Sequence, residues 1–290
     1  MTLINENNDT ETFYSSFANF EAQGETGSPA FIKPTDDLGT WMTTDPSVTL
    51  APRQQKKVDF TISIPKDAEP GGHFAVVFWG TSPSESTGVS IGAKTGVLVL
   101  LSVNGDVKQE AGLLNFNTTN KKFWYETLPV DFEYRFRNDG GDRIKPSGTI
   151  TLRDTFFIRA SRLDANPSEG NVLPASTRRL TVEWQKYSRP LDYVEPSGFF
   201  ARFWSSAVYE WKNFALGLYS AHLNVAYGTD AVHVKKTTWF FVFPWQLVII
   251  LAVIIFIVLW GGKKLIRRYN RFIIERARAN MKLPSSPPNA

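Results

Sequence analysis

Histidine and cysteine are the side chains that most often carry zinc, iron–sulfur or nucleophilic chemistry, and this sequence has three histidines and no cysteine. The lack of cysteine excludes thiolate metal sites, thiol nucleophiles and disulfides. The histidines are His73, His222 and His233, and their spacing matches no zinc-binding pattern. We therefore expect no catalytic residue and no metal site built on histidine.

Acidic residues are plentiful, and two close pairs could in principle hold calcium. The pairs are Asp36 with Asp37 and Asp139 with Asp142, and both stand in turn-like sequence. Neither segment has the alternating ligand spacing of a calcium loop, so turn formation is the expected role. No nucleophile-elbow, P-loop or dinucleotide-binding motif is present. The sequence predicts a protein that is not an enzyme and that uses no metal or cofactor.

The positive charge of the chain is concentrated at its end. Residues 263–290 hold eight Lys or Arg and one acid, Glu275, which gives this segment a charge of +7. Since the whole chain carries +4, the other residues sum to −3. The basic character is therefore a property of the tail, and we expect no nucleic acid as a partner.

The segment from Trp239 to Trp260 is 22 residues long and has no charged side chain. As a helix it would cross the roughly 30 Å hydrocarbon core of a bilayer, so we expect a transmembrane helix over 239–262. A buried helix of a soluble protein is the alternative. The expected membrane anchor consists of interfacial tryptophans, a proline at the helix start and flanking cations: Trp239, Pro244, Trp245, Trp260, Lys263, Lys264, Arg267 and Arg268.

The cations after this segment predict the orientation of the chain. By the positive-inside rule the tail, 263–290, is expected in the cytoplasm and the N-terminal region outside the cell. The tail is expected either to lie along the inner leaflet as a helix or to be a simple basic flank, with a disordered Pro-rich end. Because the first residues have no export signal, we expect the given chain to lack its true N-terminus and a first strand.

Short alternating segments separated by turn residues indicate an all-β region before residue 239. In residues 58–64 the apolar side chains alternate with polar ones, and in 130–138 they alternate with charged ones. We expect two immunoglobulin-like β-sandwich domains, at 1–105 and 113–238, followed by the transmembrane helix and the basic tail.

Two strands of the first domain depart from this pattern, because residues 73–79 and 96–103 are apolar on both faces. The flanking loops 21–46 and 81–93 could cover the outer face, or the face could be an exposed patch for a partner. The candidate residues of such a partner face are Trp41, Phe78 and Trp79.

The second domain carries an aromatic insert at about 196–214, where bulky side chains recur near helical spacing. The insert is expected to form a helix that either rests on the membrane surface or packs against the second sandwich. Its candidate membrane-surface residues are Phe199, Phe203, Trp204 and Trp211.

Residues 1–105 resemble the peptidoglycan-binding-type domain of bacterial WxL-interacting surface proteins. The matching positions are Trp41, Leu50, Pro52, Pro65, Asp67, Ala68, Pro70, Gly71 and Gly105. The second domain looks like the companion immunoglobulin-like domain of such proteins. The resemblance implies a cell-surface anchor that binds cell-wall polymer such as peptidoglycan and recruits other surface proteins. The missing export signal and the aromatic insert depart from the family pattern.

The expected function is therefore a single-pass, membrane-anchored adhesion or scaffold protein of the cell surface, located in the cell membrane. The alternative is a structural subunit of a multi-protein envelope or membrane assembly. A periplasmic chaperone or export factor is a third class, which shares the sandwich architecture but normally has no need of a basic cytoplasmic tail. Fold alone does not exclude it.

Overall fold

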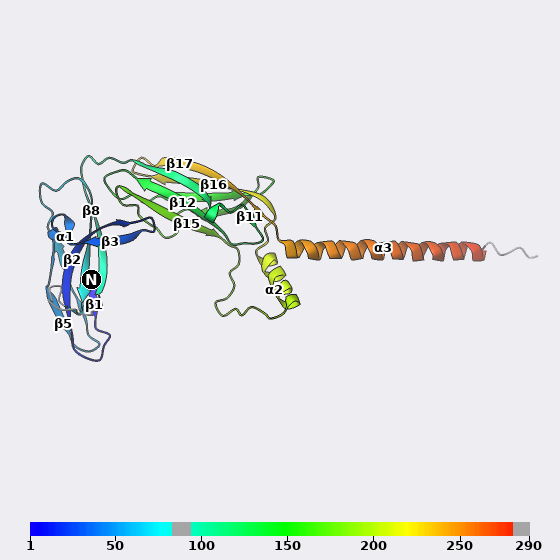
Figure 1. Cartoon of the computed structure of the whole chain (residues 1–290), viewed down its shortest axis with the longest axis horizontal. Helices are drawn as coiled ribbons and strands as arrows, with labels where there is room; N and C mark the ends of the chain where they lie inside the picture. Colours follow the sequence, from blue (N-terminus) through cyan, green and yellow to red (C-terminus); the bar gives the residue numbers. More distant parts are fainter. Residues whose placement is uncertain (83–93, 281–290) are drawn as a thin grey trace, which may run out of the picture. The chain divides into compact units, whose positions relative to one another are not determined.

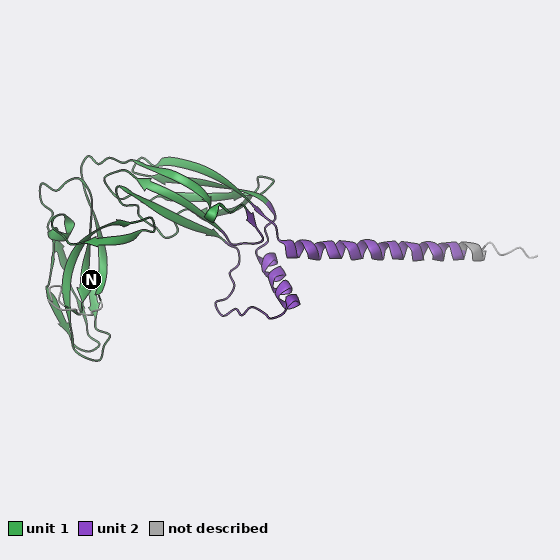
Figure 2. Cartoon of the chain, in the orientation of Figure 1, with its two compact units in different colours: residues 1–123, 131–184, 218–240 green, residues 124–130, 185–217, 241–290 purple. Residues whose placement is uncertain are grey.

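The computed structural model describes residues 1–82 and 94–280, and it is mainly β, with two β-sandwich-like domains and a C-terminal apolar helix (Figure 1). The loop 81–93 was expected to cover the outer face of the first domain, and most of it lies outside the described residues. The expected disordered end of the tail lies outside them as well. The chain divides into two compact units (Figure 2). Unit 1 consists of residues 1–123, 131–184 and 218–240, and unit 2 of residues 124–130, 185–217 and 241–290.

The main sheet of the first domain has the order β3-β2-β8-β9, and β5 also pairs with β2. Its strands are β2 (Glu11–Gln23), β3 (Ser28–Ile32), β5 (Ser47–Leu50), β8 (Gly71–Gly80) and β9 (Lys94–Val103). All of these pairs are antiparallel. The central strand β8 is buried along nearly its whole length, which explains why residues 73–79 are apolar on both faces.

Two small strand pairs and a short helix cover one face of this sheet. They are β1 (Thr2–Ile4) with β6 (Gln55–Lys57), β4 (Met42–Thr44) with β7 (Phe60–Ile62), and α1 (Leu38–Trp41). The strand expected over 58–64 is shorter in the structure, since only Phe60–Ile62 pairs with β4. Val58 instead enters the core, where it is 2% exposed, and its amide donates to the carbonyl of Met1.

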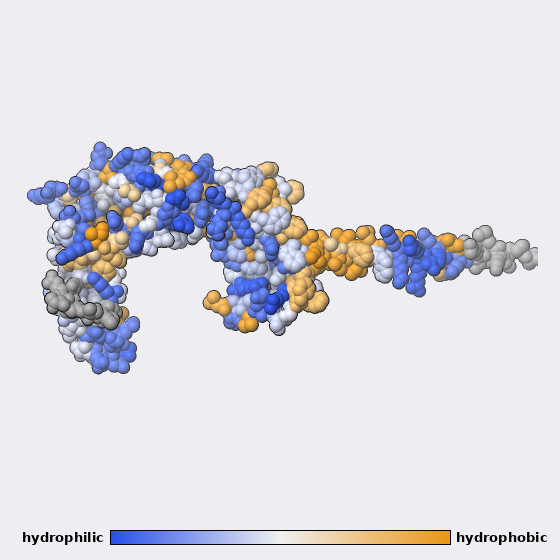
Figure 3. Space-filling view, in the orientation of Figure 1, coloured by the Kyte–Doolittle hydropathy of each residue, from blue (hydrophilic) through white to orange (hydrophobic). Residues whose placement is uncertain are grey.

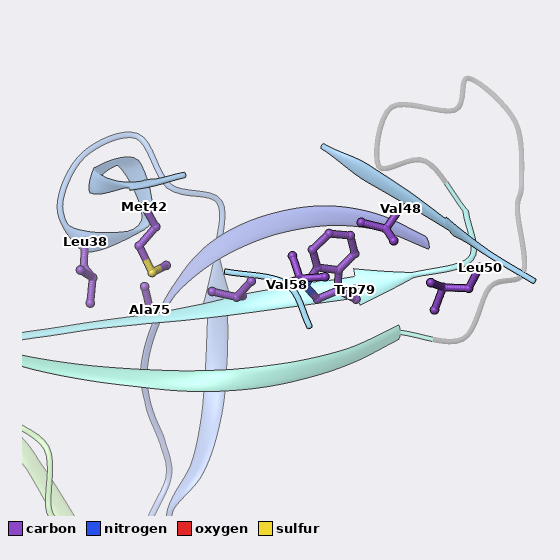
Figure 4. Packing of buried hydrophobic residues seen from close by; sticks show 8 residues of the cluster. Leu38, Met42, Val48, Leu50, Val58, Ala75 and Trp79 are labelled. Atoms are coloured by element: carbon purple, nitrogen blue, oxygen red, sulfur yellow. The ribbon is translucent and has the colours of Figure 1, made fainter. Parts of the chain in front are cut away.

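The core of the first domain lies between this cover and the main sheet (Figure 4). Its buried members are Leu38, Met42, Val48, Leu50, Val58, Ala75, Val77 and Trp79. Trp79 is 4% exposed, so it stabilises the domain from inside and does not belong to an accessible partner face. This corrects its expected role, and the reason is the period of two along β8, which turns Ala75, Val77 and Trp79 to the same side.

The second domain contains two sheets, with the orders β10-β12-β15 and β11-β17-β16-β13-β14. The first consists of β10 (Ala111–Thr118), β12 (Val130–Asn138) and β15 (Ser176–Trp184). The second consists of β11 (Trp124–Tyr125), β13 (Ser147–Arg153), β14 (Arg159–Asp164), β16 (Gly217–Tyr227) and β17 (Val232–Val242). A short 3-10 helix, η1 (Thr119–Lys121), follows β10.

Aromatic side chains form much of the core of the second domain. Trp184 is 1% exposed, and its ring centroid lies 5.2 Å from that of Tyr219 and 5.9 Å from that of Phe240. Tyr219 and Phe240 are themselves stacked, with centroids 5.6 Å apart. Phe132 reaches the same cluster through an edge-on contact with Phe240. The cluster therefore joins strands of both sheets.

Unit 2 contains the two long helices, α2 (Phe199–Lys212) and α3 (Trp245–Asn280). The expected helix start at Trp239 was wrong, because this residue lies on β17 and the helix begins after Pro244. Helix α3 also continues past Gly262 into the basic segment without a break.

By length and composition alone, α3 could cross a membrane, and none of its apolar window is buried inside the protein. Hydrophobic side chains cover its first part and hydrophilic side chains the following part (Figure 3). The cations Lys263, Lys264, Arg267 and Arg268 are all exposed on this second part.

Candidate functional site

Strand β9 has one unpaired edge. All ten of its residues pair with β8, from Lys94 opposite Gly80 to Val103 opposite Gly71. Within residues 1–82 and 94–280, no strand pairs with its other side. An edge strand of this kind presents a row of backbone donors and acceptors that another extended chain can use.

Contacts from the second domain limit how much of this edge is free. The guanidinium Nη1 of Arg143 donates to the carbonyl oxygen of Leu100 at 2.7 Å, and the hydroxyl of Ser102 donates to Asp142. These contacts lie toward the end of the strand. We use the term β9 edge for the backbone edge of Lys94–Val99 that faces away from β8.

The side chains beside the β9 edge are apolar and partly accessible. Val97 and Leu98 are each 46% exposed, which is high for adjacent apolar residues of one strand. Val99 and Leu101 pack against the core of the first domain. Because side chains alternate along a strand, Leu98 and Leu100 project from the opposite face of the sheet.

Phenylalanines cover part of that outer face. Phe20 packs against Phe74 with ring centroids 5.9 Å apart, and Phe31 packs edge-on against Phe78 at 5.0 Å. A Cβ atom at Gly96 would lie 2.7 Å from the ring of Phe78, so a residue without a side chain is required there. Phe31 reaches this face from β3, which pairs with β2 as a strand of the same sheet and is not a loop folded over the face as expected for 21–46. Leu98 stays accessible.

A cavity of about 200 Å³ adjoins this face. It is lined by β9 and β2 of the first domain and by a loop and strand of the second, including Phe20, Leu98, Leu100, Leu173 and Arg178. The guanidinium of Arg178 donates to the carbonyl of Asn171 at 2.7 Å. It also lies against Gly27 and Gly170, where a Cβ atom on either glycine would clash with it. The cavity is therefore apolar on its β9 side and carries a fixed cation on the other.

An ion pair within unit 1 connects the two domains beside this cavity. Both carboxylate oxygens of Glu25 accept from the guanidinium of Arg135, and the Nε contact is 2.8 Å long. The hydrogen bond from Arg135 holds the pKa of Glu25 below its ordinary value. The backbone of Gly72 also donates to the carbonyl of Gly141 at 3.0 Å. These contacts connect the second domain to the strands that carry the β9 edge.

The three residues expected to form a partner face are not brought together. Trp79 is in the core, whereas Phe78 lies on the outer face of the sheet with Lys94 over its ring at 4.0 Å. Trp41 packs against His73, whose ring nitrogens contact the carboxylate of Asp37 and, at 2.8 Å, the carbonyl of Glu69. Asp37 also caps α1 by accepting from the amide of Leu38, which fits the turn role expected for it.

The aromatic residues of the insert fall into two groups. Phe199, Trp204 and Trp211 are 74%, 58% and 72% exposed. Phe203 is half-buried and packs edge-on against Trp245 of α3. On β17, Trp239 is 45% exposed. Trp260 lies along α3 with the ammonium of Lys264 above its ring at 5.3 Å.

Sequence reasoning missed the β9 edge as such. The only signal for it was the two-sided apolar pattern of residues 96–103, and that pattern is equally typical of a central strand. Which strand lies at the edge depends on the order of the sheet, and the sequence does not display that order.

No protein-family model matches the sequence, and no curated protein matches it. Solved structures of fimbrial chaperones do match. The class 5 fimbriae chaperone CfaA is 12% identical, with 82% of this chain and 90% of that chain covered and a TM-score of 0.36. The E. coli chaperone DraB is 12% identical, with coverages of 82% and 87% and a TM-score of 0.30.

A third match is the CsuC–CsuE chaperone–tip adhesion subunit complex from Csu pili of Acinetobacter baumannii. It is 9% identical, with 83% of this chain and 89% of that chain covered and a TM-score of 0.32. Likenesses of this size identify no ligand or partner for the present chain.

The comparisons correct the expected family. The structural matches are fimbrial chaperones and not WxL-interacting cell-surface proteins, so the resemblance drawn from residues such as Trp41 and Pro70 was wrong. A Pro-Gly turn between two strands is common to many sandwich proteins, because proline fixes φ and glycine allows positive φ. The motif was therefore not specific.

The expected function, partners and location are corrected as well. The matching proteins are fimbrial chaperones, two of them solved with a tip adhesin or adhesion subunit, and not membrane-anchored adhesins or cell-wall binders. A lipid bilayer and peptidoglycan are thus not supported as partners, and neither is a single-pass location in the cell membrane. The membrane anchor had been inferred from sequence features alone: the length and apolar composition of the segment, its tryptophans and the cations that follow it.

Proposed function

We propose that this chain is a non-enzymatic protein-binding module that receives an extended segment of a partner protein along the β9 edge. The observation that carries the proposal is a strand fully paired on one side, unpaired on the other among the described residues, and flanked by accessible apolar side chains. Addition of a strand to an exposed sheet edge is a common way to bind peptides. As part of the same proposal, we class both sandwich domains as immunoglobulin-like.

Backbone pairing alone does not explain stable binding. Each backbone hydrogen bond contributes about 1 kcal/mol net, and ordering one residue of a flexible segment costs about 1–2 kcal/mol. Side-chain burial must therefore supply the net affinity, at about 25 cal/mol per Å² of apolar surface. The exposed surfaces of Val97 and Leu98 and the cavity beside Leu98 and Leu100 are the places where this burial would occur.

The period of two in an added strand predicts the partner's sequence pattern. Alternate residues of the bound segment would project toward the face that carries Leu98 and Leu100, where the cavity is lined mostly by apolar side chains. The intervening residues would project to the side of Val97 and Val99. A preferred segment is thus extended, with apolar residues at every second position facing the cavity.

Two peptides of identical composition test this proposal. In one the apolar and polar residues alternate, and in the other the same residues stand in two blocks. We expect the full-length chain, held in mild detergent because α3 is apolar and exposed, to bind the alternating peptide at least about tenfold more tightly in fluorescence anisotropy. Equal affinity for both peptides, or no affinity for either, would contradict the proposal.

A further inference from the structure

A long irregular connection lies against helix α2. Residues 185–198 join β15 to α2 as turns and irregular backbone, and both this connection and α2 belong to unit 2 (Figure 2). Connections of this length in a folded domain often carry function. Such a segment forms a lasting binding site only where side chains fix its conformation.

Hydrogen bonds fix this connection to α2 at two points. Asn213 follows the last turn of α2 and is 1% exposed. Its side chain accepts from the amides of Lys186 and Tyr187 at 3.2 and 3.0 Å and donates to the carbonyl of Tyr187 at 3.0 Å. Further along, the hydroxyls of Tyr193 and Ser205 are hydrogen-bonded to each other. The connection is therefore ordered before any ligand arrives, which lowers the entropy cost of binding.

A cavity of about 290 Å³ lies between the connection and α2. Its volume is close to the lower end of the range for small-ligand sites, about 300–1,000 Å³. Trp204 and Val208 form part of its wall and are 58% and 52% exposed, so apolar surface is open to solvent there. A flat apolar ligand would bury this surface. The aromatic and apolar residues of the wall are Tyr187, Pro190, Tyr193, Trp204, Val208 and Tyr209.

Two cations in the cavity wall are held over tyrosine rings. The guanidinium of Arg189 lies over the rings of Tyr193 and Tyr209, 4.5 Å from each centroid. The ammonium of Lys212 lies 4.1 Å from the ring centroid of Tyr187. Cation–π contacts of this kind fix the position of a charge without using its hydrogen-bond donors. The donors of both side chains thus remain available to a ligand.

The cavity wall is positively charged. Among the described residues, no acid lines this cavity, and the side chains of Arg189 and Lys212 form no ion pair. Asp192 and Glu195 belong to the same connection but not to the cavity wall. Two uncompensated cations disfavour a positive ligand, and the planar donor fork of an arginine matches a carboxylate or another oxyanion.

We propose that this cavity binds a small aromatic ligand that carries an oxyanion such as a carboxylate. The ring of the ligand lies against Trp204 and Val208. The oxyanion accepts hydrogen bonds from Arg189, and Lys212 adds a second positive charge. This site is independent of the β9 edge, because all of its residues belong to unit 2.

Two probes of nearly the same shape test the site. Indole-3-acetate has a ring and a carboxylate, whereas indole-3-acetamide has a neutral amide in place of the carboxylate. We expect the full-length chain in mild detergent to bind one indole-3-acetate per chain, about tenfold or more tightly than the acetamide, in ligand-observed NMR. A titration of detergent alone measures how much of each probe enters the micelles. Equal affinity for both probes, or a signal that does not saturate at one probe per chain, would overturn the proposal.

Three variants locate the bound probe. Arg189→Gln is expected to weaken indole-3-acetate binding by about tenfold or more and to leave acetamide binding nearly unchanged, because only the charged probe uses the guanidinium. Arg189→Lys keeps the charge but loses the planar fork, so a several-fold loss is expected. Trp204→Ala removes a stacking surface and is expected to weaken the binding of both probes.

Arg202→Gln is the matched control. Arg202 is an exposed cation of α2 outside this cavity, where it donates to the carbonyl of Pro196, so no change in affinity is expected. Far-UV circular dichroism shows whether each variant folds, and if Arg189→Gln does not, Arg189→Lys decides the question. Unchanged affinity in every folded cavity variant, or an equal loss in Arg202→Gln, would show that the probe binds elsewhere.

Inorganic phosphate tests whether the aromatic ring is needed. At constant ionic strength, excess phosphate is expected not to displace indole-3-acetate, because it has no ring to lie against Trp204. Displacement by phosphate would show that the cavity takes a bare anion and would contradict the proposed class of ligand.

Discussion

Replacing Leu98 by glutamate is expected to weaken binding of the alternating peptide by about tenfold or more. Leu98 is 46% exposed beside the β9 edge, and it lines the cavity that would receive a partner side chain. A carboxylate there would have to lose its water when the partner binds, which costs several kcal/mol unless a cation pairs with it. In the free protein the same carboxylate stays hydrated, so stability should change by only about 0.5–1 kcal/mol. Fluorescence anisotropy and urea unfolding measure the two effects.

Leu114→Glu is the matched control for this variant. Leu114 has the same side chain and nearly the same exposure, 44%, but lies on β10 of the second domain. Its substitution is expected to leave peptide affinity unchanged. If both variants lose affinity equally, the effect comes from surface charge and not from the β9 edge.

Replacing Trp184 by alanine is expected to destabilise the second domain by about 3–5 kcal/mol. Trp184 is 1% exposed and packs against both Tyr219 and Phe240, so its removal leaves a cavity that rigid neighbours cannot fill. Urea unfolding followed by far-UV circular dichroism should show a lower transition midpoint for the domain.

Trp204→Ala is the control for this loss of stability. Trp204 is 58% exposed on α2, so its substitution should cost less than about 1 kcal/mol. If Trp184→Ala were as mild as this control, the aromatic cluster would not be the centre of the second domain.

The buried faces of regular strands could be predicted from the sequence. In β12 the residues Val130, Phe132, Tyr134 and Phe136 are fully buried, as their alternation with charged residues predicted. The aromatic spacing likewise predicted a helix at about 196–214, and α2 forms there. These features depend on local periodicity, which a sequence displays directly.

Features that depend on tertiary arrangement could not be predicted. Trp79 and Phe78 are neighbours with similar side chains, and only the packing of the domain shows that Trp79 is in the core. Residues 239–242 are apolar enough for the helix, but they continue β17 because they pair within a sheet.

Hydrogen exchange at the β9 edge tests the central claim most directly. The amides of Lys94–Val99 that face away from β8 have no strand partner in the described chain, and a bound segment would supply one. With saturating alternating peptide, we predict that exchange in this segment slows by about tenfold or more while exchange in β12 is unchanged. Tight peptide binding without any slowing of exchange in residues 94–99 would contradict the account.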